Sequence, residues 1–196
     1  MNEKSLFSTL LLLAALLLGA CSPEREAPPL QGASIGGPFT LTNQQGRPVS
    51  DTDFRGRYRL IYFGYSYCPD VCPVDLQQIA QGLRLFEKAD PDRASRVQPI
   101  FITIDPERDT PVVLKDYVAA FHPRLVGLTG TPEQIENVAK SFGIYSAKRD
   151  DGKKSNYLMD HSRTALLFGP RGEPIALVPQ DQGAEAVAAS LRRWVK

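Results

Sequence analysis

Two cysteines, Cys68 and Cys72, occur in the stretch GYSYCPDVCPVD with three residues between them, and each is followed by a proline. A thiol pair this close can cycle between dithiol and disulfide, hold a metal ion or form a structural bridge. The structural bridge is the weakest interpretation, because the loop that it would close is short and little entropy would be removed from the unfolded chain. The pair therefore predicts redox chemistry or metal binding.

The prolines indicate how this stretch is built. Pro73 suits the first turn of a helix, where its missing N–H has no intrahelical partner to lose. Cys72 would then lie at or near the helix N-terminus, whose partial positive charge lowers the pKa of a thiol and stabilises the thiolate. Thiolates attack disulfides and also bind soft metals, so the local sequence leaves both interpretations open.

The elements that must position the cysteines follow from the hydrophobic pattern. Continuous apolar runs predict buried strands, and apolar residues at helical spacing predict helices between them. The expected order is a hairpin at 39–50, strands at 58–67, 96–105 and 124–130 alternating with helices at 73–89, 110–121 and 131–144, then two strands within 161–179 and a helix at 183–196. This order predicts an α/β, thioredoxin-like fold with a mixed central sheet, helices on both faces and an N-terminal β-hairpin. Sites in such sheets gather beyond the carboxyl ends of central strands, where Cys68 lies.

A third ligand candidate begins to separate metal binding from redox cycling. Dithiol oxidoreductases typically have two residues between their cysteines, and a structural zinc site needs four ligands, for which this chain has no second cysteine pair. His161 immediately precedes a buried strand, and in a thioredoxin-like fold the loop before this strand passes beside the cysteine loop. Two thiolates and one imidazole form a three-ligand site that suits Cu(I), whereas Cu(II) would recruit another ligand.

Asp160 and His122 are two further residues whose side chains can contribute to a metal site. Asp160 directly precedes His161 and is a candidate for orienting the imidazole or for adding charge near the metal, the alternative being a carboxylate in a surface turn. His122 follows an amphipathic helix and precedes Pro123. It is expected to be a surface residue at a helix end and not a ligand.

The N-terminal sequence predicts the compartment. The run LFSTLLLLAALLLGAC is short for a transmembrane helix, which needs about 20 apolar residues, and it fits the core of a signal peptide. Its ending LGAC predicts a lipoprotein signal peptide over 1–20 and a lipidated Cys21, although an uncleaved anchor or a plain secretory signal has similar features. Residues 21–38 predict a flexible tether, and 39–196 the thioredoxin-like copper-binding domain. We therefore expect an exported protein of the bacterial cell envelope, facing the periplasm and anchored to a membrane as a lipoprotein.

Composition narrows the class of function. A net charge of +1, with 42% hydrophobic and 23% charged residues, is typical of a soluble domain and shows no basic stripe for nucleic acid. If Cys21 carries lipid, Cys68 and Cys72 are the two of the 3 cysteines that remain in the folded domain. An exported pair drifts to a disulfide in an oxidising compartment unless it is reduced or metal-bound.

These features together resemble the Sco/SenC family of thioredoxin-fold copper chaperones for cytochrome c oxidase. The motifs GYSYCPDVCP, TIDPERDTP and DHS carry the resemblance, which extends from about Phe39 to Trp194. One departure is that many members carry a transmembrane helix, whereas LGAC predicts lipid here. Asp105 and Asp109 belong to the second motif, and we expect them to have a structural role at a strand end and a helix start.

The resemblance implies the ligands, the partners and the function. Cys68, Cys72 and His161 match the copper ligands of the family, and Asp160 matches the carboxylate before the ligand histidine. The implied function is a metallochaperone for the CuA centre of cytochrome c oxidase subunit II, served by a copper donor and a thiol reductant. The alternative is a thiol–disulfide oxidoreductase that reduces the cysteines of the oxidase copper site through a redox-active Cys68–Cys72 disulfide. A peroxiredoxin-like peroxidase is disfavoured, because the chain shows no matching motif around Cys68.

Overall fold

The central sheet of the protein is mixed, as the order of elements predicted. The computed structural model describes residues 26–149 and 157–196. Seven strands follow one another across the sheet in the order β2 (Pro48–Ser50), β1 (Thr40–Asn43), β5 (Val126–Thr129), β4 (Val97–Thr103), β3 (Tyr58–Gly64), β8 (Ala165–Phe168) and β9 (Pro174–Val178). Strands β3, β4 and β5 are parallel, and the outer pairings are antiparallel.

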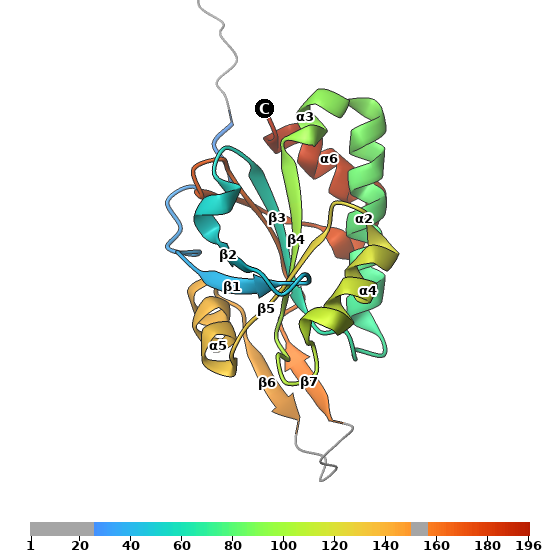
Figure 1. Ribbon diagram of the computed structural model, residues 1–196. Helices are drawn as coiled ribbons and strands as arrows, with labels where there is room; N and C mark the ends of the chain where they lie inside the picture. Colours follow the sequence, from blue (N-terminus) through green and yellow to red (C-terminus); the bar gives the residue numbers. More distant parts are fainter. Residues whose placement is uncertain (1–25, 150–156) are drawn as a thin grey trace, which may run out of the picture.

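Helices cover both faces of this sheet (Figure 1). The helical segments are η1 (Asp51–Phe54), α2 (Val71–Ala89), α3 (Pro91–Ser95), α4 (Pro111–Phe121), α5 (Pro132–Ser141), η2 (Gln180–Gln182) and α6 (Ala184–Trp194). Helices α2, α4 and α6 lie on one side of the sheet, and α5 lies on the other (Figure 1). The thioredoxin-like α/β fold is therefore confirmed.

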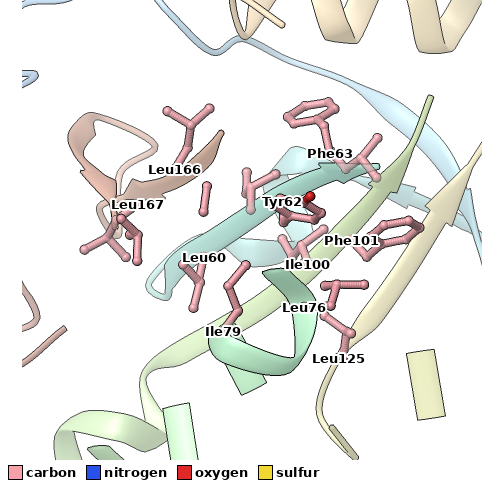
Figure 2. Close-up of a cluster of buried hydrophobic side chains, with 14 of the residues drawn as sticks. Leu60, Tyr62, Phe63, Leu76, Ile79, Ile100, Phe101, Leu125, Leu166 and Leu167 are labelled. Atoms are coloured by element: carbon pink, nitrogen blue, oxygen red, sulfur yellow. The ribbon is translucent and has the colours of Figure 1, made fainter. Parts of the chain in front are cut away.

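Burial on both faces explains why the two central strands have apolar centres. Every residue of β3 and β4 is buried. Figure 2 shows Ile79 of α2 packed near Leu60 on one face of the sheet, while Phe63 points to the opposite face. The register pairs Gly64 with Thr103, so β3 and β4 end at the same edge of the sheet. The chain leaves this edge from β3 directly into the cysteine stretch.

A separate two-stranded ribbon lies beyond this edge, formed by β6 (Ser146–Arg149) and β7 (Leu158–His161). The hydrophobic pattern had not predicted it, because both strands are short and none of their residues is fully buried. His161 is consequently the last residue of a strand, whereas the sequence had placed it in a loop.

The described part of the expected tether packs against the domain. The backbone N–H of Leu30 donates to the carbonyl of Ile175 at 3.0 Å, and that of Gly36 donates to the carbonyl of Ser141 at 2.8 Å. Leu30 and Ile35 also pack on the hydrophobic core. These contacts fix a segment that the sequence predicted to be flexible, because its few apolar residues find partners on the folded domain.

The predicted signal peptide over 1–20 and the predicted lipid site at Cys21 lie outside the described residues. Among the helices within 26–149 and 157–196, none combines the length and the apolar character that a membrane span requires.

Candidate metal centre

Cys68, Cys72 and His161 converge beyond the carboxyl end of β3. One ligand atom from each residue lies within 4.8 Å of the others. Sγ of Cys72 is 3.2 Å from Nε2 of His161, although 89 positions separate the two residues in the chain. The three candidate ligands predicted from the sequence are therefore brought together by the fold.

The two cysteines come together through a bend rather than a turn of helix. Cys68 is half-buried and precedes the helix, whereas Cys72 is buried in the first turn of α2. The backbone N–H of Cys72 donates to Sγ of Cys68 at 3.4 Å. Both cysteines are free thiols. The sequence is compatible with either a regular helical turn or a tight loop over residues 68–72, and this geometry shows the tight loop.

Burial controls the protonation of Cys72. Desolvation raises the pKa of this thiol well above its ordinary value, although a backbone hydrogen bond at Tyr65 acts in the opposite direction. The expected lowering by the helix N-terminus is wrong for Cys72, because the residue is 0% exposed and desolvation dominates. Cys72 is therefore a neutral thiol in the metal-free protein, and a bound cation would favour its thiolate.

This difference predicts unequal reactivity of the two thiols. In the native reduced protein at neutral pH, iodoacetamide should modify Cys68 at least about tenfold faster than Cys72, because Cys68 is accessible and Cys72 is both buried and protonated. Mass spectrometry of the peptides over time measures the two rates. Unfolding the protein in denaturant should make them similar. Equal rates in the native protein would contradict the assignment.

The imidazole of His161 is held in the orientation that a ligand needs. Nδ1 lies 2.9 Å from the carbonyl oxygen of Ser162, so an Nδ1–H donates to that oxygen and Nε2 is left free to face Cys72. The Tyr65 ring packs edge-on against the imidazole, with 5.9 Å between centroids. Burial lowers the pKa of His161, which favours the neutral form that binds metals.

Asp160 does not orient this ring. Within the described residues its carboxylate pairs with Arg149 on the exposed side of the ribbon. Successive residues of a strand point to opposite faces, so Asp160 and His161 diverge. The carbonyl of Ser162 takes the orienting role instead. Sequence reasoning missed it, because a backbone carbonyl carries no residue-type signal.

His122 does not belong to the cluster of Cys68, Cys72 and His161. The sequence predicted a surface residue, but the structure buries it. It is 3% exposed, and its Nε2 lies 3.4 Å from a carboxylate oxygen of Glu87 in α2. Its Nδ1 accepts a hydrogen bond from the backbone N–H of Arg124, whose guanidinium also pairs with Glu87. The chain after α4 thus folds back onto α2 and buries the ring.

A family model described as SCO1/SenC matches residues 27–196. This chain belongs to the SCO1/SenC family. The mouse protein SCO2 homolog, mitochondrial, is 39% identical over 167 residues, which are 85% of this chain and 65% of that protein. Across the curated relatives compared, this chain spans 42–65% of their length.

Solved structures agree with this membership. Bradyrhizobium japonicum ScoI with copper bound is 41% identical, with a TM-score of 0.73 over 82% of this chain and 99% of that chain. Yeast Sco1 with copper bound is 34% identical, with a TM-score of 0.75 over 83% of this chain and 88% of that chain. The SCO1/SenC fold therefore extends over nearly all of the described residues.

The relatives also correct the expected location. Curated SCO1/SenC relatives from mouse, yeast, Arabidopsis and human, at 37–40% identity, are mitochondrial proteins. This finding overturns the prediction of a bacterial cell-envelope lipoprotein. The physical reason is that an apolar run is recognised by several export and membrane systems, so its hydrophobicity does not specify the compartment.

The DPERDTP motif of this SCO1/SenC chain ties the loops around the cluster together. The Asp109 carboxylate accepts hydrogen bonds from the Ser66 backbone N–H at 3.0 Å and from the Thr103 hydroxyl at 2.5 Å. The Asp105 carboxylate accepts from the Tyr157 hydroxyl at 2.7 Å. Asp109 thus joins the cysteine loop to β4, and Asp105 joins the start of the β7 segment to the same motif. These hydrogen bonds between loops are the structural role that we expected for Asp105 and Asp109.

Gly64 provides the space behind Cys72. A Cβ at this position would lie 3.1 Å from Sγ of Cys72 and 3.2 Å from the Phe101 ring. Gly64→Val should therefore lower the free energy of unfolding by about 1–3 kcal/mol, as overpacked cores do, and urea denaturation measures the loss. Gly37→Val is the matched control, because a Cβ there meets nothing closer than 3.8 Å. Equal stability of the two variants would show that the space behind the sulfur is not needed.

Proposed function

We propose that this protein is a metallochaperone that binds copper through Cys68, Cys72 and His161 and assists assembly of the CuA centre of cytochrome c oxidase subunit II. The observation that carries the proposal is the convergence of two cysteine sulfurs and one imidazole nitrogen within 4.8 Å. Soft thiolates and a neutral imidazole suit Cu(I), and Cu(II) is expected to recruit another ligand. Two relatives at 34–41% identity have structures with copper bound, which supports copper as the metal.

The unequal burial of the ligands suits a protein that receives a metal ion and releases it. Cys72 is the buried ligand, whereas Cys68 and His161 are both half-buried and form the accessible side of the site. A donor or acceptor thiolate can approach the metal from this side and exchange ligands one at a time. The buried thiol of Cys72 loses its proton when copper binds and regains it when copper leaves.

The proposal includes membrane attachment through the segment before residue 26. The apolar run within that segment supports it. The described chain starts at the end of the domain opposite to the β6–β7 ribbon (Figure 1). An attachment at that end would leave the metal site facing away from the membrane, where it is accessible to a partner.

A titration tests copper binding and a transfer assay tests the chaperone role. The reduced protein is titrated with Cu(I) in competition with a chromophoric chelator, and it should take up one equivalent. The loaded protein is then mixed with the reduced copper domain of oxidase subunit II, and the absorption of the assembled CuA centre is followed. No uptake by the reduced protein would refute copper binding. Uptake without transfer would refute the delivery role.

The second candidate function is reduction of the disulfide in the oxidase copper site. It is favoured by two free thiols whose sulfurs lie within 4.8 Å, one of them accessible. In this reaction Cys68 and Cys72 form a disulfide while the target disulfide gains two electrons and two protons, and an external thiol reductant restores the pair. The metal-free protein should then reduce the oxidised copper domain, and His161→Ala should retain that activity. Loss of reduction in His161→Ala would contradict this candidate.

A further inference from the structure

We infer that Asp75 and Arg163 are positioning residues for the metal site, and that their ion pair holds His161 opposite Cys72. The inference rests on the proposed copper-binding function and assigns a role to two side chains that are not ligands. Asp75 lies in α2 one turn after Cys72, and Arg163 lies two residues after His161. The pair therefore joins the two chain segments that carry Cys72 and His161.

Asp75 and Arg163 form a bidentate contact in which the carboxylate is buried and the arginine side chain is partly exposed. Nη2 of Arg163 lies 2.7 Å from one carboxylate oxygen of Asp75, and Nε lies 3.1 Å from the other. Asp75 is 1% exposed, whereas the Arg163 side chain is 44% exposed. A bidentate guanidinium–carboxylate contact fixes orientation as well as distance, which a single hydrogen bond does not.

The surroundings of Asp75 make this partner necessary. The Tyr62 hydroxyl donates to the same carboxylate at 2.9 Å, so β3 is joined to the pair. A buried carboxylate without a cation is unfavourable, and a neutral hydroxyl does not balance its charge. The backbone carbonyl of Arg163 accepts a hydrogen bond from the buried Gln180 side chain at 2.9 Å. Hydrogen bonds therefore hold both the side chain and the backbone carbonyl of Arg163 in place.

The β6–β7 ribbon explains why His161 needs such a link. The ribbon forms a two-stranded sheet of its own, and β8 begins only at Ala165. His161 lies at the end of β7, and Tyr65 contacts this strand through the Met159 N–H and the His161 ring. The position of His161 relative to α2 also depends on the short connection to β8. Arg163 is in this connection and reaches α2 through Asp75. The pair thus sets the separation between the imidazole and the Cys72 sulfur.

The chain contains a matched control on the same ribbon. Arg149 pairs with Asp160, the residue directly before His161, with both side chains about half exposed. This second pair also joins an arginine to an aspartate, but it connects β6 to β7 and does not reach α2. If any loss of an ion pair near His161 weakened copper binding, Arg149→Gln would do so as well.

Copper affinity and its dependence on His161 test the inference. Asp75→Asn, Arg163→Gln and the double variant, which leaves no unpaired buried charge, should each weaken Cu(I) binding by about 10- to 100-fold, the usual effect of removing a residue that orients a ligand. Arg163→Lys should recover part of the affinity, and Arg149→Gln should bind like the native protein. In a His161→Ala background the same changes should have no further effect, because they act through His161.

A second measurement needs no copper. The chain has 2 histidines, so the imidazole ¹⁵N signals of the metal-free protein can be assigned by comparison with His122→Ala. Arg163→Gln should shift the His161 ring signals and leave those of His122 unchanged. Shifted signals in a protein that binds no Cu(I) would support the positioning role and refute copper binding. Unshifted signals, or an equal loss of affinity in the His161→Ala background, would overturn the inference.

Discussion

Replacing either Cys68 or Cys72 by serine should abolish tight Cu(I) binding. A serine hydroxyl is a hard, protonated oxygen at neutral pH, and Cu(I) selects soft thiolates. Removing a ligand should cost more than removing the groups that orient one, so we expect a loss of affinity of at least about 100-fold. Competition with a chromophoric chelator measures it on the reduced variants.

Stability measurements separate this effect from unfolding. Cys68 is half-buried, so Cys68→Ser should leave the free energy of unfolding nearly unchanged. Cys72→Ser places a hydroxyl in a buried site and should cost about 1–3 kcal/mol. A Cys68→Ser protein that still held one equivalent of Cu(I) with native affinity would show that copper is bound elsewhere or by fewer ligands.

His161→Ala should weaken Cu(I) binding by at least about 100-fold while leaving the fold intact. The imidazole presents its free Nε2 toward the cysteine sulfurs, and the alanine variant keeps only the two thiolates. Chelator competition gives the affinity. Electron paramagnetic resonance of the Cu(II) form should show that hyperfine coupling to the imidazole nitrogen is lost.

His122→Ala is the control for this prediction. His122, like His161, is a histidine packed against the domain. It contacts Glu87 and the chain after α4, and it is not part of the metal-ligand cluster. Its removal should reduce the free energy of unfolding and leave copper affinity unchanged. If His122→Ala lowered copper affinity as much as His161→Ala, the three-ligand site would be wrong.

Several features of the fold could be predicted because they depend on local patterns. Strands β3 and β4 are buried on both faces, and such strands appear in the sequence as segments with a continuous apolar centre. Thr110 and Pro111 mark the start of α4 as a capping residue and a first-turn proline. The β6–β7 ribbon has neither kind of signal, since its residues are only partly buried and its pairing depends on the surrounding fold.

The residue types determined the chemistry of this protein, and the tertiary structure determined its environment. Two cysteines with a fixed spacing and one histidine before an apolar strand specify a soft-metal site, because ligand preference belongs to the side chains themselves. Only the fold decided that Cys72 is a neutral buried thiol, that the carbonyl of Ser162 orients the imidazole, and that Asp75 meets Arg163 across 88 positions of sequence. The reason is that desolvation and ion pairing depend on what surrounds a group in space, and neighbours in space are distant in the chain.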